Sequence, residues 1–274
     1  MEIAMRRLVQ VVVVILAGLV SQSASAFDLS GLSKTERAET IRFAVNNSLF
    51  TLYHEVAHLL IDKLNLPVLG REEDAADNIA TWILLQKKTP DANDTLVDAA
   101  RGWRLTGDSF NNVFTDDDYA SGYSPERQRS LQIVCMMVGA DGAAFREVAN
   151  YYQIHAARQD TCFYDYDMLD RSMRGLLPRE SKGTRVSVRY REPGTRLRLA
   201  ERILRNSGIF DAVAEEIRQG YRIDGRVKFT AKSCGEPNAF YDPQTVEIIF
   251  CYELMQDFID LHSVDRTTRT TGRK

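Results

Sequence analysis

Cysteine, histidine, proline and tryptophan are all scarce in this 274-residue sequence, which has four, four, seven and two of them respectively. The length and composition exclude a disulfide-stapled miniprotein, a disordered chain and a collagen-like fibre, and no internal repeat is visible. Basic residues are not in excess either, because 35 lysines and arginines stand against 38 aspartates and glutamates. A nucleic-acid-binding protein is therefore not expected. The hydrophobic content of 44% is ordinary for a folded chain of one large domain or two small ones.

Long apolar runs are also absent, except for one near the N-terminus over residues 8–20. A pair of arginines precedes this run, and Ala24-Ser25-Ala26 follows it as a small-x-small cleavage site. The order is typical of a secretory signal peptide, and the run is shorter than the roughly 20 apolar residues of a bilayer span. We therefore expect a cleaved signal over residues 1–26, with an uncleaved anchor as the alternative. Residues 27–274 would then be periplasmic or secreted, with no stable membrane anchor.

Export changes the interpretation of the four cysteines. An even number of cysteines in an oxidising compartment indicates two disulfides. The pairs Cys135–Cys162 and Cys234–Cys251 are favoured because each closes a local loop, and buried free thiols are the alternative. No two cysteines have the short Cys-x-x-Cys spacing of a zinc knuckle, so cysteine is not an expected metal ligand.

Hydrophobic periodicity predicts helices first and strands later. Helices are expected over residues 46–64, 72–87, 91–105, 124–139, 141–152 and 164–176. After a break near residue 180, strands are expected over 185–192, 227–232 and 245–250, with helices over 195–219 and 253–261. The expected fold is a single α+β domain, with a helical lobe over about 27–180 and a sheet-bearing lobe over about 181–262. A flexible tail is expected over 263–274.

His54-Glu55-Val56-Ala57-His58 is the central functional motif. Residues four apart lie on one face of a helix, so the two histidines can bind one metal ion. Glu55 stands beside the first histidine and can accept a proton from water at the metal. The motif uses two of the four histidines in the chain and falls on a predicted amphipathic helix. It therefore predicts a zinc site with Glu55 as its catalytic base.

A third ligand is expected from the acidic segment that follows, at the start of the next predicted helix. A catalytic zinc needs three protein ligands and an open position, which one carboxylate would complete. Glu73 is the favoured ligand and Glu72 is its rival. Asp77 lies four residues after Glu73, on the same helix face, and could hydrogen-bond the outer nitrogen of a ligand histidine. The alternative is a solvated acidic helix N-terminus.

This arrangement resembles that of the gluzincin metallopeptidases, such as thermolysin and neprilysin. The segment Glu73-Asp-Ala-Ala-Asp77-Asn is similar to the Glu-Asn-Ile-Ala-Asp-Asn segment of the neprilysin group. The resemblance implies a gluzincin-like fold in which Glu73 is the third zinc ligand and Asp77 orients His54. The chain as a whole is similar to a family of exported bacterial proteins described as metallopeptidases.

A second segment, Asn238-Ala239-Phe-Tyr-x-Pro243, is similar to the edge strand that binds the peptide backbone in neprilysin. The resemblance assigns Asn238 and Ala239 to substrate binding, and a hairpin turn beside a disulfide is the alternative. In neprilysin this segment precedes the zinc helix, whereas here it follows by about 180 residues. Either the order of the segments is permuted or the second similarity is coincidental.

The resemblance also implies a residue that stabilises the oxyanion of the tetrahedral intermediate. His155 and Arg158 are the main candidates for this role, and His262, Tyr241 and Tyr53 are the alternatives. The expected function is zinc-dependent hydrolysis of a peptide or protein substrate. Two alternatives use the same motif: a non-catalytic, zinc-stabilised peptide-binding protein, and a zinc amidase acting on a non-peptide bond such as one in the cell wall.

Overall fold

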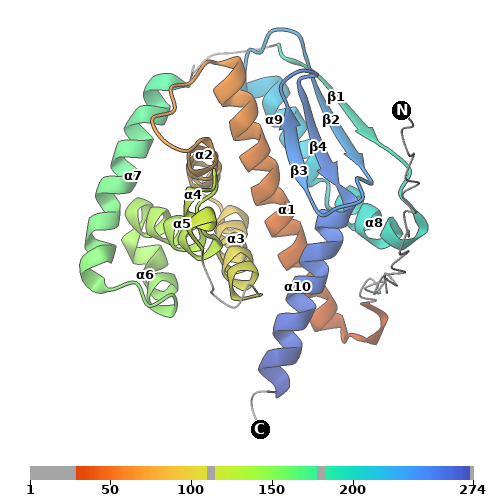
Figure 1. The fold of residues 1–274 in the computed structure, drawn as a ribbon, viewed down its shortest axis with the longest axis horizontal. Helices are drawn as coiled ribbons and strands as arrows, with labels where there is room; N and C mark the ends of the chain where they lie inside the picture. Colours follow the sequence, from red (N-terminus) through yellow and green to blue (C-terminus); the bar gives the residue numbers. More distant parts are fainter. Residues whose placement is uncertain (1–28, 110–114, 178–182, 272–274) are drawn as a thin grey trace, which may run out of the picture.

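The computed structural model describes residues 29–109, 115–177 and 183–271 (Figure 1). The helices are α1 (Lys34–Lys63), α2 (Glu72–Lys87), α3 (Pro90–Ser109), α4 (Asp116–Ala120), α5 (Glu126–Ala140), α6 (Gly142–Tyr151), α7 (Ala156–Leu176), α8 (Arg198–Ser207), α9 (Ile209–Gly220) and α10 (Tyr252–Thr271). The strands are β1 (Arg185–Tyr190), β2 (Arg226–Lys232), β3 (Ala239–Asp242) and β4 (Glu247–Cys251). The fold is therefore α+β, as the sequence predicts. The signal expected over 1–26 lies outside the described residues.

Helix α1 carries the His-Glu-x-x-His motif and runs between the helical lobe and the sheet (Figure 1). It starts a dozen residues before the segment predicted as helical. Ser33 caps it by accepting a hydrogen bond from the Glu36 backbone nitrogen, and Glu36 accepts one from the Ser33 nitrogen in return. The expected start near Asn46–Ser48 is therefore wrong. Asn47 is buried within the helix and donates to the Asp98 carbonyl, which joins α1 to α3.

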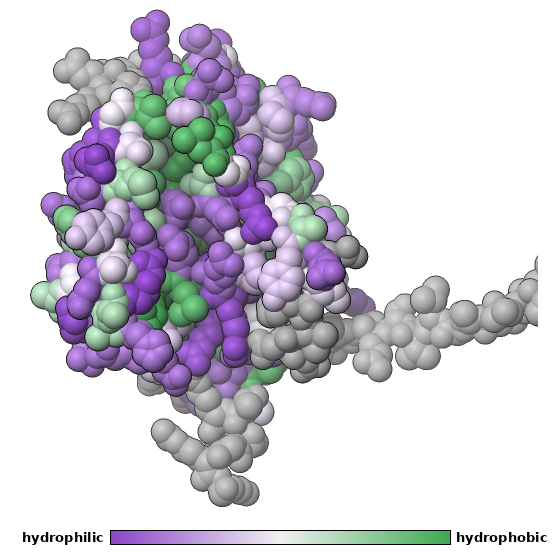
Figure 2. Space-filling model, turned by 60° about the vertical axis from the view of Figure 1, so that its left-hand side comes forward, coloured by the Kyte–Doolittle hydropathy of each residue, from purple (hydrophilic) through white to green (hydrophobic). Residues whose placement is uncertain are grey.

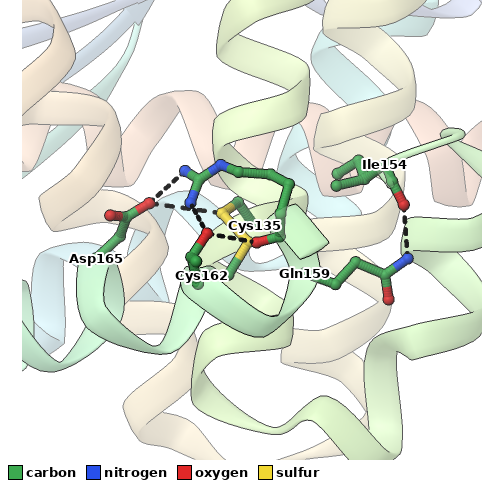
Figure 3. The surroundings of a disulfide bond; sticks show 7 residues. Cys135, Ile154, Gln159, Cys162 and Asp165 are labelled. Carbon is green, nitrogen blue, oxygen red and sulfur yellow. Dashed lines mark hydrogen bonds and ion pairs between the residues drawn. A yellow bond between two sulfur atoms is a disulfide. The ribbon is translucent and has the colours of Figure 1, made fainter. Parts of the chain in front are cut away.

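The helical lobe is held together by the disulfide Cys135–Cys162, which joins α5 to α7 (Figure 3). One turn along α5, a Cβ atom on Gly139 would lie 2.3 Å from the Cys162 carbonyl oxygen. Only glycine allows the two helices to approach this closely. The second predicted disulfide, Cys234–Cys251, ties the loop after β2 to the end of β4. Both predicted pairings are confirmed.

The sheet has the strand order β1-β2-β4-β3. β1 pairs parallel with β2, and β2 pairs parallel with β4, so the α8–α9 segment forms the crossover between β1 and β2. β3 pairs antiparallel with β4 and forms one edge of the sheet. This edge lies beside α1 (Figure 1). The short strand β3 therefore borders the helix that carries the metal-binding motif.

One contiguous hydrophobic core extends through both lobes and includes Val56 of α1, Met137 of α5, Phe229 of β2 and Phe250 of β4.

Two features expected for the C-terminal part of the chain are wrong. The helix expected over 195–219 is interrupted, because Gly208 adopts a φ of +69° between α8 and α9.

The flexible tail expected from residue 263 is instead part of α10, which continues to Thr271. Ser263 is only 3% exposed because α10 packs along α1. Asp265 also pairs with Arg101 of α3, and Arg266 pairs with Glu36 of α1.

The surface face in Figure 2 is mainly hydrophilic, and its hydrophobic residues form separate areas rather than one continuous patch. Among the described residues, no helix combines the length and the apolar character needed to span a bilayer.

Candidate metal centre

Three side-chain atoms from α1 and α2 converge on one point. His54 Nε2 lies 3.2 Å from His58 Nε2 and 3.1 Å from Glu73 Oε2. His58 Nε2 lies 3.6 Å from the same Glu73 oxygen. His54 and His58 meet because they are four residues apart on α1, and Glu73 enters from the first turn of α2.

The outer nitrogens of both histidines are held by carboxylates. His54 Nδ1 lies 2.9 Å from Asp77 Oδ1, and His58 Nδ1 lies 2.8 Å from Glu72 Oε1. An ionised carboxylate only accepts hydrogen bonds, so each Nδ1 carries the proton and each Nε2 of a neutral ring presents a lone pair. The Nε2 atoms and the Glu73 oxygen are then three acceptors facing one another. Such a group needs a cation between its members.

The separations fit a metal ion. Zinc binds nitrogen and oxygen ligands at about 2.0–2.1 Å in a tetrahedral arrangement, which places neighbouring ligand atoms about 3.3 Å apart. The three observed separations, 3.1, 3.2 and 3.6 Å, lie close to this value. His54, His58 and Glu73 can therefore hold a metal ion, and a His₂Glu donor set is typical of catalytic zinc.

In the absence of a metal, the same contacts shift the protonation of the ligands. Burial lowers the pKa of His54, but the hydrogen bonds to Asp77 and Glu73 outweigh it and raise the pKa to about 9. Burial raises the pKa of Glu73, yet the two histidines hold that pKa well below its ordinary value. The attraction that binds a proton here would bind a metal cation instead.

Asp77 is held in place by Arg129 of α5. The Arg129 guanidinium donates from Nε to Asp77 Oδ2 at 2.6 Å and from Nη2 to Asp77 Oδ1 at 2.8 Å. Its other surface covers the Trp103 ring, 3.5 Å from the ring centroid. Both ends of the pair are buried, and Arg129 and His54 keep the pKa of Asp77 low although burial raises it. A connected set of Arg129, Asp77 and His54 thus fixes the orientation of the first imidazole.

Glu55 lies beside the metal-binding atoms without joining them. It is buried, and burial raises the pKa of its carboxyl to about 7 against the opposing charges of His54 and His58. The backbone of Tyr241, on the edge strand, also hydrogen-bonds this carboxyl. Glu55 therefore faces the space between the metal-binding atoms and β3.

This space is a cavity of about 830 Å³ between α1, α3, α10 and β3. It is lined by His54, Glu55 and His58 of the motif, by Glu73 of α2, and by Asn238 and Ala239. Cys251 N donates to Asn238 O, and in an antiparallel pair the bonded positions alternate along the strand. Ala239 and Tyr241 therefore direct their backbone groups away from β4, toward the free edge and the cavity.

The predicted oxyanion candidates do not line this cavity. His155 precedes α7, and Arg158 pairs with Asp165 beside the Cys135–Cys162 disulfide. The expectation that either residue lies at the metal site is wrong, because the α6–α7 connection lies on the far side of α5 (Figure 1). Tyr123, in the loop before α5, lines the cavity instead. Burial, the nearby Glu73 charge and a hydrogen bond to Glu73 raise the pKa of its phenol, so the phenol keeps its proton.

The comparison with known families agrees with this chemistry. A family model, DUF4344, with the description "Putative metallopeptidase" matches residues 9–177 and 190–273, which together are most of the chain. The chain belongs to the DUF4344 family. No curated protein and no solved structure matches it.

Two residues of this DUF4344 protein's site were not expected from its sequence. Arg129 belongs to a segment predicted only to be helical, and Tyr123 directly precedes that segment. Neither residue belongs to a recognisable motif, and neither has a spacing along the sequence from His54 or His58 that would indicate a contact. Only the packing of α5 against α2 brings both to the metal centre.

Proposed function

We propose that the protein is an exported zinc-dependent metallopeptidase that hydrolyses peptide bonds. The observation that carries the proposal is the convergence of His54, His58 and Glu73, with Glu55 beside them, in a cavity bordered by a free strand edge. The general assignment as a metallopeptidase also agrees with the description of the family. Zinc, the catalytic base and export are our own inferences.

Each side chain has a distinct task in this proposal. His54, His58 and Glu73 would hold zinc, which supplies Lewis acidity toward water and the scissile carbonyl. Glu55 takes a proton from the attacking water and passes it to the nitrogen of the leaving amine. Asp77 and Glu72 keep the Nδ1 protons on the two histidines, so that their Nε2 lone pairs face inward.

The edge strand would position the substrate. An extended peptide can add to a free sheet edge through backbone hydrogen bonds. Ala239 and Tyr241 offer such groups along the cavity, and Asn238 adds a side-chain amide at the end of the strand. The peptide would then run along β3 past Glu55 and would replace the hydrogen bond between Glu55 and the Tyr241 backbone.

Tyr123 is the donor that we assign to the oxyanion. Its hydroxyl keeps its proton and hydrogen-bonds Glu73, and the side chain lines the cavity. Zinc bound by Glu73 would compete for that carboxylate and leave the Tyr123 hydroxyl to donate to the substrate. Tyr241, which also lines the cavity, donates to Asp62 at 2.6 Å, away from the metal-binding atoms. A donor directed at the developing negative charge is the usual requirement for acyl transfer.

A non-catalytic zinc site is the main rival. Structural zinc sites are usually closed by four protein ligands. Within the described residues, the group at this site has three members, which leaves a position open. The open position favours catalysis over a structural role. A zinc amidase acting on a non-peptide amide would use the same residues and differ only in its substrate.

Chelation tests the proposal directly. Incubation with a strong chelator, followed by its removal, is expected to abolish cleavage of a peptide mixture, and one equivalent of zinc should restore it. The readout is the appearance of new peptide termini in a mass spectrum. Cleavage that persists in the metal-free protein would contradict the proposal.

A further inference from the structure

The cavity extends from the metal centre toward the start of α10. Leu254, Asp257 and Phe258 line it from α10, and Phe50 and Thr51 line it from α1. Positions three and four apart share one face of a helix, so the three α10 residues face the cavity together. The two helices touch here, since α1 and α10 pack against each other. This end of the cavity therefore combines apolar walls with a carboxylate.

Within the part of the chain that the structure describes, no residue forms a hydrogen bond or an ion pair with the Asp257 carboxylate. The carboxylates of Glu72, Glu73 and Asp62 all have such partners. Asp257 is a solvent-exposed residue at the wall of the cavity. Partial burial and the charge of Asp260, one turn along, still raise the pKa of its carboxyl. A carboxylate beside a like charge is stabilised by a cation.

No lysine or arginine among the described residues that line the cavity is free to pair with Asp257. Arg129 is the only arginine or lysine among the described residues that line the cavity, and Asp77 occupies it. The lining also includes Glu55, Asp62 and Glu72, so the hollow is acidic. An acidic cleft attracts cationic ligands and disfavours anionic ones.

The strand geometry indicates which part of a peptide would reach Asp257. The hydrogen bond from Cys251 N to Asn238 O places Asn238 beside the junction of β4 and α10. Tyr241, at the other end of β3, contacts Asp62 near the C-terminal end of α1. Antiparallel pairing is slightly more stable per residue than parallel pairing, so we take the peptide to add antiparallel to β3. It would then run from the Tyr241 end toward the Asn238 end. Its C-terminal half would approach α10.

We propose that Asp257 determines specificity by binding the cationic group of a lysine or arginine side chain that follows the cleaved bond. The side-chain methylenes would lie along Leu254 and Phe258, as the stems of cationic residues lie along apolar surfaces. This inference rests on the proposed peptidase function.

The test maps cleavage sites in a complex peptide mixture. The substrates are peptides made by a Glu-specific protease, which retain internal lysines and arginines. The zinc-loaded protein, its Asp257→Asn and Asp257→Lys variants and the inactive Glu55→Gln variant are compared by mass spectrometry. Asp260→Asn is the matched control, because Asp260 is on the same helix but does not line the cavity.

We expect lysine and arginine to be enriched roughly 10-fold after the cut, the effect of one charge-assisted contact. The enrichment should be lost in Asp257→Asn, kept in Asp260→Asn and replaced by a preference for acidic residues in Asp257→Lys. Glu55-dependent cuts without this pattern would overturn the inference and leave the peptidase proposal intact. Asp257-dependent cuts found only beside peptide N-termini would instead assign Asp257 to the α-ammonium group. If no cut depends on Glu55, both proposals fail.

Discussion

Replacing Glu55 by glutamine is expected to lower peptide hydrolysis by about 10³-fold while leaving the metal bound. Positioned general bases contribute on the order of 10²–10⁴-fold to such reactions. Glutamine has nearly the same shape but cannot accept the proton from water. The metal-binding atoms belong to His54, His58 and Glu73, so their arrangement should persist.

The matched control is Glu39→Gln, which makes the same change at an exposed position of the same helix. Rates are measured on one peptide with equal metal content in all three proteins. Near-normal hydrolysis by Glu55→Gln, or loss of metal from it, would contradict the role of Glu55 as the proton acceptor.

Replacing Arg129 by methionine is expected to lower the free energy of unfolding by about 3–5 kcal/mol, the usual cost of leaving one partner of a buried ion pair uncompensated. The substitution leaves Asp77 buried with only His54 as a partner. It should also weaken metal binding by about 10–100-fold, because the carboxylate that orients His54 loses its own support. An Arg129→Lys substitution should not restore stability or metal affinity, since lysine cannot reproduce the bidentate contact with Asp77.

Arg127→Met provides the control on the same helix. Arg127 pairs with Asp108 at the surface, where ion pairs contribute about 0–1 kcal/mol. Urea unfolding of the metal-free proteins separates stability from metal affinity, which is measured by competition with a chelating dye. Equal effects of the two substitutions would show that the Arg129–Asp77 pair has no special importance.

The metal ligands could be predicted from the sequence because their relation is local. His54 and His58 share one helix face, and Glu73 and Asp77 share a face of the next helix. The contact between these two helix faces was implied by the resemblance to the gluzincin metallopeptidases, and it is present in the structure. The cysteine pairing also followed from short loops.

Other parts of the site could not be predicted because they depend on tertiary contacts. Arg129 meets Asp77 across 52 residues of sequence, through the packing of α5 on α2. Asp257 faces the cavity only because α10 lies against α1, and a pattern of apolar residues does not reveal that face. The prediction that the chain frays after Ser263 failed for the same reason, since polarity alone did not reveal the contacts with α1 and α3.

The metal content of the purified protein tests the central claim most directly. Native mass spectrometry of residues 27–274 is compared with that of the Glu73→Ala and Glu72→Ala variants. Glu73 contributes one of the three converging atoms, whereas Glu72 contacts only the outer nitrogen of His58. The account predicts one zinc per chain in the parent and in Glu72→Ala, and none in Glu73→Ala. A parent protein that takes up no zinc, or a Glu73→Ala variant that retains it, would contradict the account.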